Sequence, residues 1–390
     1  MKTLDLGKVP PLGELPETMK AFVIRKEREG DPVDSMLMED IDIPELGPNE
    51  VLVLVMAAGI NFNGVWAARG NPVSVFKIHP DDPMHIAGSD ASGIVWKLGS
   101  AVTNWKVGDE VVLHCNQSCR QCPQCNGGDP LACERQQIWG YETSWGSFSQ
   151  FCKVQSQQLL PKPKQLSWEE ASSYGLTYFT AYRMLIDQAK IEAGENVLVW
   201  GASGGLGVFA VQLCKLVGAN PIAVVSRDDK ADLVRSLGAE MVINRNEFDL
   251  SKGPSESKRF GKKIRELTGG EDVDVVFEHV GQYTFPTSVL IPKRFGRIVI
   301  CGATSGYELT FDARYLWMRQ KRIIGSHFAN TFEAHKANRL IQQGKIKPVL
   351  DEVFEFEQTA EAHQAMAENR HKGKMAILVQ AEPQSGGSTS

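Results

Sequence analysis

Four cysteines stand close together in the first half of the sequence, within the stretch SCRQCPQCNGGDPLAC, whose Pro and Gly residues indicate a loop. Thiols at this spacing can surround one tetrahedral Zn²⁺ ion, and a closed shell of four sulfurs leaves no position for a substrate. We therefore predict a structural zinc site, with an iron–sulfur cluster and free buried thiols as the alternatives. The predicted ligands are Cys119, Cys122, Cys125 and Cys133.

A glycine-rich turn separates the strand-like run NVLVW from the helix-length run VFAVQLCKLVG. Glycines at such a junction permit a tight turn. They also let backbone N–H groups at the start of the helix approach a pyrophosphate, whose charge the helix dipole favours. We expect the turn to bind a dinucleotide through Gly201, Ser203, Gly204, Gly205, Leu206 and Gly207.

The next strand-like run, PIAVV, ends in Ser226-Arg227-Asp228 rather than directly in an acidic residue. An acidic residue there accepts hydrogen bonds from the ribose 2′-OH of NAD, whereas Ser and Arg offer donors to the 2′-phosphate of NADP. NADPH is therefore the predicted cofactor, bound by Ser226, Arg227 and Lys230. The alternative is that Arg227 and Lys230 form a solvated helix start.

Two kinds of segment must hold these groups in place. Between about residues 21 and 167, short β-like runs broken by Gly and Pro indicate a compact, mostly antiparallel β domain. From residue 196 on, strand-like runs alternate with helix-length segments, as in a parallel, doubly wound sheet. The piece after about residue 328 is too short to be a domain, so we expect it to complete the first one. The predicted α/β organisation is a β-rich catalytic domain at 1–167 and 328–390, with the zinc loop at 115–134, and a Rossmann cofactor domain at 168–327.

The composition excludes several classes of protein. A chain of 390 residues with 42% hydrophobic residues exceeds what one core usually supports. Its formal charge of −5 gives no basis for binding nucleic acid or an anionic membrane, and no apolar run approaches the ~20 residues that span a bilayer.

The N-terminus lacks the apolar core of a signal peptide, and eight cysteines are too few for a disulfide scaffold, so we expect a cytoplasmic location. We expect the final residues, QSGGSTS, to form a disordered tail, and predict core positions for Cys115, Cys152, Cys214 and Cys301.

Several long strings of the sequence are uncommon and specific. They are NFNGVW (61–66), HIAGSDASG (85–93), IWGYETSWG (138–146), VLVWGASGGLG (197–207), KRFGKKIRELTGGEDVDVVFEH (258–279) and RYLWMRQKRIIGSHFAN (314–330). With the order of domains, they resemble the medium-chain dehydrogenase/reductase superfamily over almost the whole chain, and within it the crotonyl-CoA carboxylase/reductase group of enoyl-CoA reductases. This resemblance implies a GroES-like catalytic domain beside the Rossmann domain. The four-cysteine loop is a departure, since that group usually lacks it and the zinc-bearing branch of the superfamily keeps it.

A second departure concerns a catalytic metal. The superfamily's zinc-dependent alcohol dehydrogenases have a Cys in the loop that residues 60–63 occupy here and a His-Glu pair after the glycine equivalent to Gly88. This sequence has Ser89-Asp90 instead, so it offers no thiol or imidazole pair to hold a catalytic zinc. A hydride acceptor already activated by conjugation, such as an α,β-unsaturated thioester, then becomes the natural substrate.

The resemblance implies an NADPH-dependent enzyme that reduces a short-chain enoyl-CoA, such as crotonyl-CoA or acryloyl-CoA, with carboxylation by CO₂ at Cα. In the group, an Asn amide, a Phe-Glu pair and a His form the CO₂ pocket. The corresponding residues here are Asn63, Tyr141, Glu142 and His327, with Tyr141 in place of the Phe.

Each of these residues also has a structural interpretation. Asn63 could cap a helix, because Asn is a good cap residue. Glu142 could be a solvated loop carboxylate, and His327 could be a buried structural histidine. Glu278-His279 ends another strand at the same sheet edge. From the residues alone, that pair ranks level with His327.

Three other functions stay open at this point: enoyl-CoA reduction without carboxylation, reduction of a quinone or enone, and dinucleotide binding without catalysis. The basic run at 258–265 is an additional candidate for contacting CoA phosphates, although such runs more often form a solvated helix face. We also expect a homodimer or homotetramer, because RIIGSH lies near a sheet edge that a second copy could extend.

Overall fold

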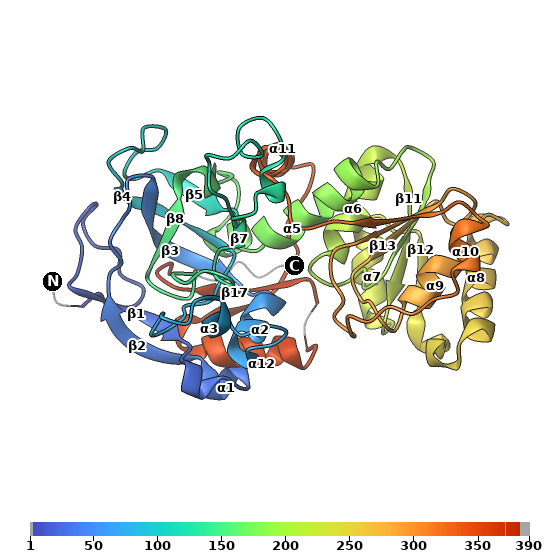
Figure 1. Cartoon of the computed structure of the whole chain (residues 1–390), viewed down its shortest axis with the longest axis horizontal. Coiled ribbons are helices and arrows are strands. Elements are labelled where there is room, and N and C mark those ends of the chain that lie inside the picture. The colour runs from blue at the N-terminus through green and yellow to red at the C-terminus, as the bar shows by residue number, and fades with distance from the viewer. Residues whose placement is uncertain (1–2, 371, 383–390) are drawn as a thin grey trace. The chain divides into compact units, whose positions relative to one another are not determined.

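The computed structural model describes residues 3–370 and 372–382, so the predicted disordered tail lies outside the described residues. The chain forms two compact units (Figure 1). Unit 1 comprises residues 1–176, 330–342 and 348–390, and unit 2 comprises residues 177–329 and 343–347. In the part of the chain that is described, no helix is both long and apolar enough to cross a bilayer.

Unit 1 is built on a mostly antiparallel sheet, as its short β-like runs predicted. Its strands follow the order β16-β17-β3-β4-β5-β9, and β8 also pairs with β3. The long strand β3 is buried along almost its whole length because its residues, EVLVLVMAAG, are nearly all apolar. The strands are β3 (Glu50–Gly59), β4 (Ala91–Leu98), β5 (Glu110–Leu113), β8 (Phe151–Gln155), β9 (Leu159–Pro161), β16 (Leu350–Glu355) and β17 (Lys374–Leu378).

Shorter elements complete unit 1. Two small antiparallel pairs lie outside the main sheet: β1 (Thr18–Val23) with β2 (Leu37–Asp42), and β6 (Asn116–Gln117) with β7 (Gln137–Ile138). The helices are α1 (Pro32–Ser35), α2 (Phe62–Arg69), α3 (Val75–Ile78), α4 (Trp168–Ala171), α11 (Thr331–Gln342) and α12 (Thr359–Ala367).

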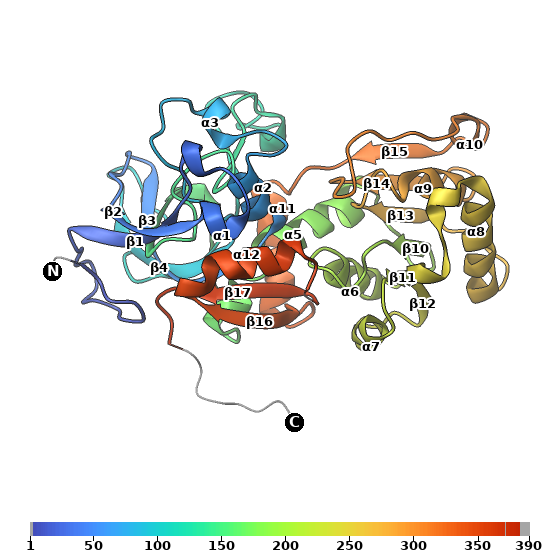
Figure 2. The ribbon, with the colours of Figure 1, turned by 90° about the horizontal axis from the view of Figure 1, so that it is seen from below.

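The end of the chain returns to unit 1. Strand β17 pairs antiparallel with β3, with Ala376 opposite Gly59, and β16 pairs parallel with β17. Helix α12 packs against α1 and α2, and Figure 2 shows it, in red, beside β17 and β16. The last described strand is therefore an interior strand of a sheet that begins with residues near position 50.

Unit 2 is a six-stranded parallel sheet in the order β12-β11-β10-β13-β14-β15, the doubly wound pattern predicted from its alternating runs. Its strands are β10 (Asn196–Val199), β11 (Asn220–Val225), β12 (Met241–Asn244), β13 (Val275–Glu278), β14 (Arg297–Ile300) and β15 (Arg322–Gly325). Its helices are α6 (Gly207–Val217), α7 (Asp229–Ser236), α8 (Pro254–Thr268), α9 (Phe285–Leu290) and α10 (Arg314–Trp317), and α5 (Gly175–Tyr182) begins at the end of unit 1. The α/β fold predicted from the sequence is confirmed.

Helix α8 carries the basic run and shows how its two faces differ. Phe260 and Ile264 are buried in the core of unit 2, whereas Lys258, Arg259 and Lys262 are exposed. Arg259 is bound to Glu256 in the first turn of the same helix. The basic side chains therefore lie on the exposed face of α8, and their contact with CoA phosphates stays a prediction.

Candidate functional site

Asn63 lies in the first turn of α2, where its side chain is 8% exposed. Its amide nitrogen Nδ2 has no hydrogen-bond partner among the described residues. The N-cap position of α2 is occupied by Asn61. Asn63 is therefore not the helix cap, which was its alternative role from the sequence. A buried amide donor without a partner costs about 1–3 kcal/mol, so this N–H group is able to bind a ligand or a water at a net gain.

The close approach of two helices fixes the position of α2. A Cβ atom added to Gly64 would lie 2.3 Å from Nε2 of His363 in α12, so only glycine fits there. The ring of His363 also packs edge-on against Phe148, with ring centroids 4.6 Å apart. Burial lowers the pKa of His363 to about 4, so the imidazole is neutral near pH 7.

Tyr141 and Glu142 lie in the loop after β7, next to α2. The Tyr141 ring lies 6.4 Å from that of Trp66 in α2, and Trp66 packs edge-on against Phe62 at 5.3 Å. Glu142 is half-buried, and its Oε2 accepts a 2.7 Å hydrogen bond from the backbone N–H of Ile138. Burial raises the pKa of Glu142 in spite of that bond, so this carboxyl is not a freely solvated one.

Two of the strings that carry the family resemblance pack directly against each other. Gly88, in HIAGSDASG, donates its N–H to the carbonyl of Gly140, which lies in IWGYETSWG, and its own carbonyl accepts from the N–H of Ser147, the residue that follows that string. A Cβ atom on Gly140 would come 1.9 Å from Gly88 O, so this approach requires glycine. The contact brings Ser89 and Ser147 into one buried region, and neither hydroxyl has a partner within the described ranges.

Asp90 lies at one of the two positions where zinc-dependent relatives have the His-Glu pair, and here it forms a buried ion pair. Asp90 and Lys374 are fully buried, and Nζ of Lys374 lies 3.3 Å from Oδ2 of Asp90. Burial raises the pKa of the Asp90 carboxyl, and the nearby ammonium of Lys374 opposes that rise. Sequence reasoning missed Lys374, although a lysine that opens the apolar run KMAILV was a visible signal.

The glycine-rich turn follows β10 in unit 2, as predicted. Gly201 has a φ of +55°, and a Cβ atom on Gly207 would lie 2.3 Å from Gly201 O, so both positions need glycine. Ser203 is buried in the turn, and Gly204, Gly205 and Leu206 are partly exposed before α6 begins. Backbone groups at the start of an 11-residue helix are therefore open to a pyrophosphate.

The end of β11 carries the residues that were predicted to select NADPH. Arg227 is exposed, and its guanidinium binds Asp229 through two hydrogen bonds of 3.0 Å. The carbonyl of Ser226 accepts a bond from Asn246 Nδ2 at 2.6 Å. Lys230 is 5% exposed, so the alternative of a wholly solvated helix start is wrong for this lysine.

The histidines at the edge of the parallel sheet differ in their surroundings. Glu278 is fully buried, and Thr284, Ser288 and two backbone N–H groups donate to its carboxylate. His279 contacts the carbonyl of Trp200 at 2.9 Å, beneath the glycine-rich turn. His327 lies two residues after β15 with part of its side chain exposed, and nearby protein and Arg183 still lower the pKa of its imidazole, so it is neither a freely solvated nor a fully buried histidine.

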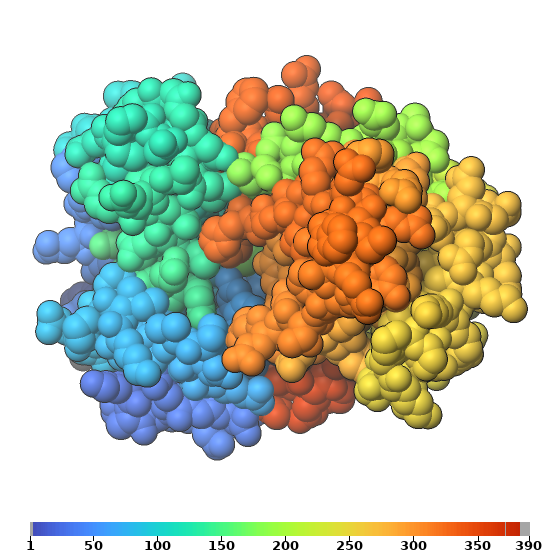
Figure 3. Space-filling view, turned by 45° about the vertical axis from the view of Figure 1, so that its right-hand side comes forward, coloured from blue at the N-terminus to red at the C-terminus, as the bar shows by residue number. Residues whose placement is uncertain are grey.

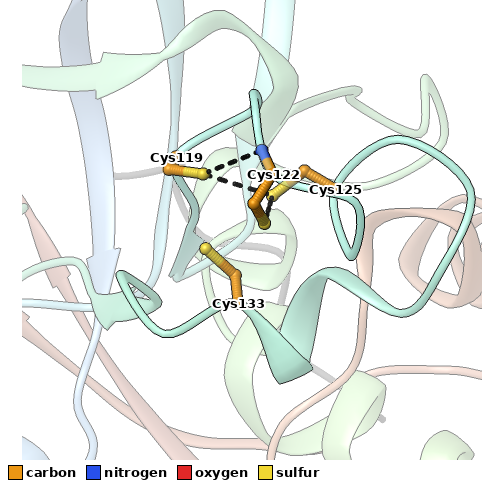
Figure 4. A group of neighbouring side chains, drawn as sticks. All are labelled: Cys119, Cys122, Cys125 and Cys133. Atoms are coloured by element: carbon orange, nitrogen blue, oxygen red, sulfur yellow. Dashed lines mark hydrogen bonds between the residues drawn. The ribbon is translucent and has the colours of Figure 1, made fainter.

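The four predicted zinc ligands gather at one point in unit 1 (Figure 4). Their sulfur atoms all lie within 4.8 Å of one another, with Sγ–Sγ distances of 3.6 Å from Cys122 to Cys125 and 3.9 Å from Cys119 to Cys125. A tetrahedral Zn²⁺ with four thiolates places its sulfurs about 3.8 Å apart, so the group fits the ion. Backbone N–H groups of Gln121 and Cys122 donate to Sγ of Cys119 and lower its pKa to about 6, whereas burial and the neighbouring thiols raise the pKa of Cys122 to about 11.

Three of the other four cysteines occupy core positions, in agreement with the prediction, and the fourth is less buried than predicted. Cys115, Cys152 and Cys214 are buried, Cys301 is half-buried, and all are free thiols. Burial raises the pKa of each of these thiols, so they are not reactive groups at neutral pH.

Comparison with known proteins places both units. Residues 47–164 match the model of the alcohol dehydrogenase GroES-like domain, and residues 205–343 match that of zinc-binding dehydrogenases. The chain is 51% identical to a crotonyl-CoA carboxylase/reductase of Cereibacter sphaeroides, over 98% of this chain and 92% of the relative.

Two solved structures are similar over nearly the whole chain. A crotonyl-CoA carboxylase/reductase superimposes with a TM-score of 0.94 at 52% identity, covering 98% of this chain and 93% of its own. A 2-octenoyl-CoA carboxylase reductase in complex with NADP and 2-octenoyl-CoA gives 0.92 at 39% identity, covering 97% of this chain and 91% of its own. The chain therefore belongs to the crotonyl-CoA carboxylase/reductase family of the medium-chain dehydrogenase/reductase superfamily.

Proposed function

We propose that this protein reduces a short-chain enoyl-CoA, such as crotonyl-CoA or acryloyl-CoA, with NADPH and carboxylates the product at Cα with CO₂. The observation that carries the proposal is the amide of Asn63, which is buried and unpartnered among the described residues. Among the described residues, the side-chain group that could hold a metal ion is the four-cysteine cluster, which does not include Asn63. Close relatives named crotonyl-CoA carboxylase/reductase support the same activity.

The glycine-rich turn of unit 2 suits NADPH, and we propose that unit 2 binds the cofactor and unit 1 the reacting part of the substrate. When bound, NADPH supplies the hydride that adds to Cβ of the enoyl thioester. The addition leaves an enolate whose Cα forms a bond either to the carbon of CO₂ or to a proton. The first outcome gives an alkylmalonyl-CoA and the second a saturated acyl-CoA.

The residues of the chain decide between these outcomes by holding CO₂ and excluding water. The Nδ2 of Asn63 is a donor for one oxygen of CO₂. On the family resemblance, Glu142 of unit 1 and His327 of unit 2 are each proposed as hydrogen-bonding groups for the CO₂ step, and Tyr141 as a residue that excludes water. The half-buried position of Glu142 and its raised pKa support a role away from bulk solvent.

The decisive experiment follows NADPH oxidation with crotonyl-CoA and with acryloyl-CoA, each with and without bicarbonate, and then measures product mass. We expect an alkylmalonyl-CoA at high bicarbonate and a saturated acyl-CoA without it. If only saturated acyl-CoA forms at a high bicarbonate concentration, the protein is an enoyl-CoA reductase that does not carboxylate. If neither thioester is consumed, the proposed substrate class is wrong, and quinones and enones become the next substrates to test.

The choice of cofactor can be tested at Arg227. Its guanidinium is exposed, and Asp229 already orients it, so it is free to exchange that partner for a 2′-phosphate. Arg227→Ala should weaken NADPH binding by roughly tenfold to a hundredfold, because a charge-assisted hydrogen bond contributes about 1.5–3 kcal/mol. NADH binding should change little. Equal turnover with NADH and NADPH in the unmodified protein would contradict the assignment.

We propose that the four-cysteine cluster holds one structural Zn²⁺ through Cys119, Cys122, Cys125 and Cys133. The sulfur distances and the complete thiol set support this ion, and all four positions of the tetrahedron are taken by the protein. The ion would stabilise the loop and would take no part in the hydride step.

We further propose a homodimer or homotetramer. Strand β15 ends the sheet of unit 2 and is mostly exposed, as are Phe295, Trp317 and Met318. Figure 3 shows the orange segment that holds α10 and β15 at the surface. An unpaired edge strand with apolar neighbours is suited to pair with a second copy, and light scattering of the purified protein measures the outcome.

A further inference from the structure

We propose that Asp90, Lys374 and Asn61 form a positioning network that sets where the amide of Asn63 stands and thereby how the enolate divides between CO₂ and a proton. The inference rests on the proposed function. It adds three residues that do not touch the reacting atoms and assigns them to the carboxylation step.

The ammonium of Lys374 is bound on three sides. Its Nζ donates to Ile60 O at 2.7 Å and to Asn61 Oδ1 at 2.5 Å, and it lies 3.3 Å from Oδ2 of Asp90. The side chain is 2% exposed, so water cannot replace these partners. Since an ammonium group has three N–H donors, its hydrogen-bonding capacity is used up within the network.

The carboxylate of Asp90 joins three segments of unit 1. Its Oδ2 accepts from Asn61 Nδ2 at 2.8 Å, and its Oδ1 accepts from Leu176 N at 2.5 Å, at the start of α5. Gly59, at the end of β3, lies so close that an added Cβ atom would be 2.9 Å from Cβ of Asp90. The turn before α2, the start of α5 and strand β17 therefore meet at one carboxylate.

The network holds the residue at the N-cap position of α2. Asn61 occupies the N-cap position of α2, yet its side chain makes no capping hydrogen bond and binds Lys374 and Asp90 instead. The entry of the chain into α2 is thus set by contacts with β17 and β4, not by the helix itself. Asn63 follows two residues later, so a shift of this turn moves its amide directly.

A purely stabilising role explains the network less well. Burying an ion pair costs desolvation free energy that the attraction barely returns, so apolar side chains would stabilise the same place equally well. The charges do supply directional contacts to a carbonyl, an amide and a backbone N–H. Directional contacts matter where an atom must be held in place, because an error of about 1 Å can cost up to a hundredfold in rate.

The test compares the ratio of carboxylated to merely reduced product in the full-length protein with NADPH, crotonyl-CoA and fixed bicarbonate. The main variant is the double change Asp90→Asn with Lys374→Met, which removes both charges together and leaves no unpaired buried ion. The second variant is Asn61→Ala, which leaves both charges and cuts their link to α2. We expect the ratio to fall by about tenfold in each, with a higher KM for CO₂ and NADPH oxidation within about threefold of the unmodified protein.

Gln150→Leu is the matched control. Gln150 is fully buried in unit 1, and its amide binds Leu4 O and Gln380 Oε1, but it does not touch the turn before α2. The control should lower the melting temperature and leave the product ratio unchanged. An unchanged ratio in a folded network variant, or an equal fall in the control, would overturn the positioning role. If the unmodified protein makes no carboxylated product, the proposed function fails first, and the two failures are thus distinguishable.

Discussion

Unit 1 contains two clusters of polar side chains that are built in opposite ways. The thiol cluster gathers four side chains of one kind from a single loop, and each sulfur is free to bind the same ion. The ion network gathers Asp90, Asn61 and Lys374 from distant parts of the chain, and each group already satisfies another. The first cluster offers four ligands to the proposed metal ion, whereas the groups of the second bind one another.

The difference shows how one fold separates stability from chemistry. A soft, closed donor set suits a structural ion and offers no position to a substrate. In the network an ammonium occupies the carboxylate and amide oxygens, so they are not available to hold a Lewis acid beside the substrate. The fold then needs a substrate that accepts hydride without such help, and an enoyl thioester is one.

Removing one thiol should give the largest effect. Cys122→Ser takes away one of four ligands, and because metal binding contributes directly to folding, unit 1 should lose about 5 kcal/mol or more of stability. Metal analysis should find about one zinc per chain in the unmodified protein and much less in the variant. Hydride transfer should persist in the folded fraction. If the purified protein is active and stable without a metal ion, the thiol cluster is not a structural zinc site.

Removing one charge of the Asp90–Lys374 pair should lower the free energy of unfolding nearly as much as the loss of a thiol does. Asp90→Asn leaves the ammonium of Lys374 buried without its counter-ion, a loss of about 3–5 kcal/mol that urea unfolding can measure. The double change of Asp90→Asn and Lys374→Met should restore most of this loss. If the single and double variants are equally unstable, the pair does not act as a unit, and the contrast with the thiol cluster is weaker than we describe.

A smaller effect, on the product ratio, is expected from a change at Asn63, which belongs to neither cluster. Asn63→Leu keeps the volume of the side chain and removes its amide, so the CO₂ step should lose about 1–3 kcal/mol while reduction continues. Mass spectrometry should show more saturated acyl-CoA and less alkylmalonyl-CoA at the same bicarbonate concentration. A parallel fall of both products would point to a general role of α2 in substrate binding.

The smallest effect concerns Glu142 and its dependence on pH. Burial raises its pKa in the folded state, so the protonated form adds stability below the ordinary value of 4.5, and this gain disappears as the pH rises. At pH 7 the carboxylate is therefore slightly unfavourable, and Glu142→Gln should stabilise unit 1 by a few tenths of a kcal/mol, since solvent screens a half-buried group. At pH 4 the gain should vanish. Thermal unfolding at both pH values checks the sign, and a loss of carboxylation in the stabilised variant would separate function from stability.

The sequence predicted most of the fold because local patterns carry it. The strand–turn–helix pattern around Gly201 and the thiol spacing each lie within a single continuous stretch of about two dozen residues or fewer, so local sequence holds the signal. The unpartnered amide of Asn63 and the bond between Lys374 and Asn61 depend instead on segments more than 300 residues apart. Periodicity does not report such contacts. A charged residue at the start of an apolar strand was the one local clue to the network.

The place of β17 within the sheet has a consequence for biosynthesis. A ribosome delivers residues 177–329 as one continuous piece, so unit 2 can fold while the chain is still being made. Unit 1 has to wait, because the last residues of β3, 57–59, lack their partner strand and Asp90 lacks Lys374 until residues 374–378 leave the exit tunnel. During that interval the nascent chain exposes an apolar strand edge, which is a template for aggregation. Truncations that stop short of Lys374 should therefore yield insoluble protein even though they retain the whole of unit 2.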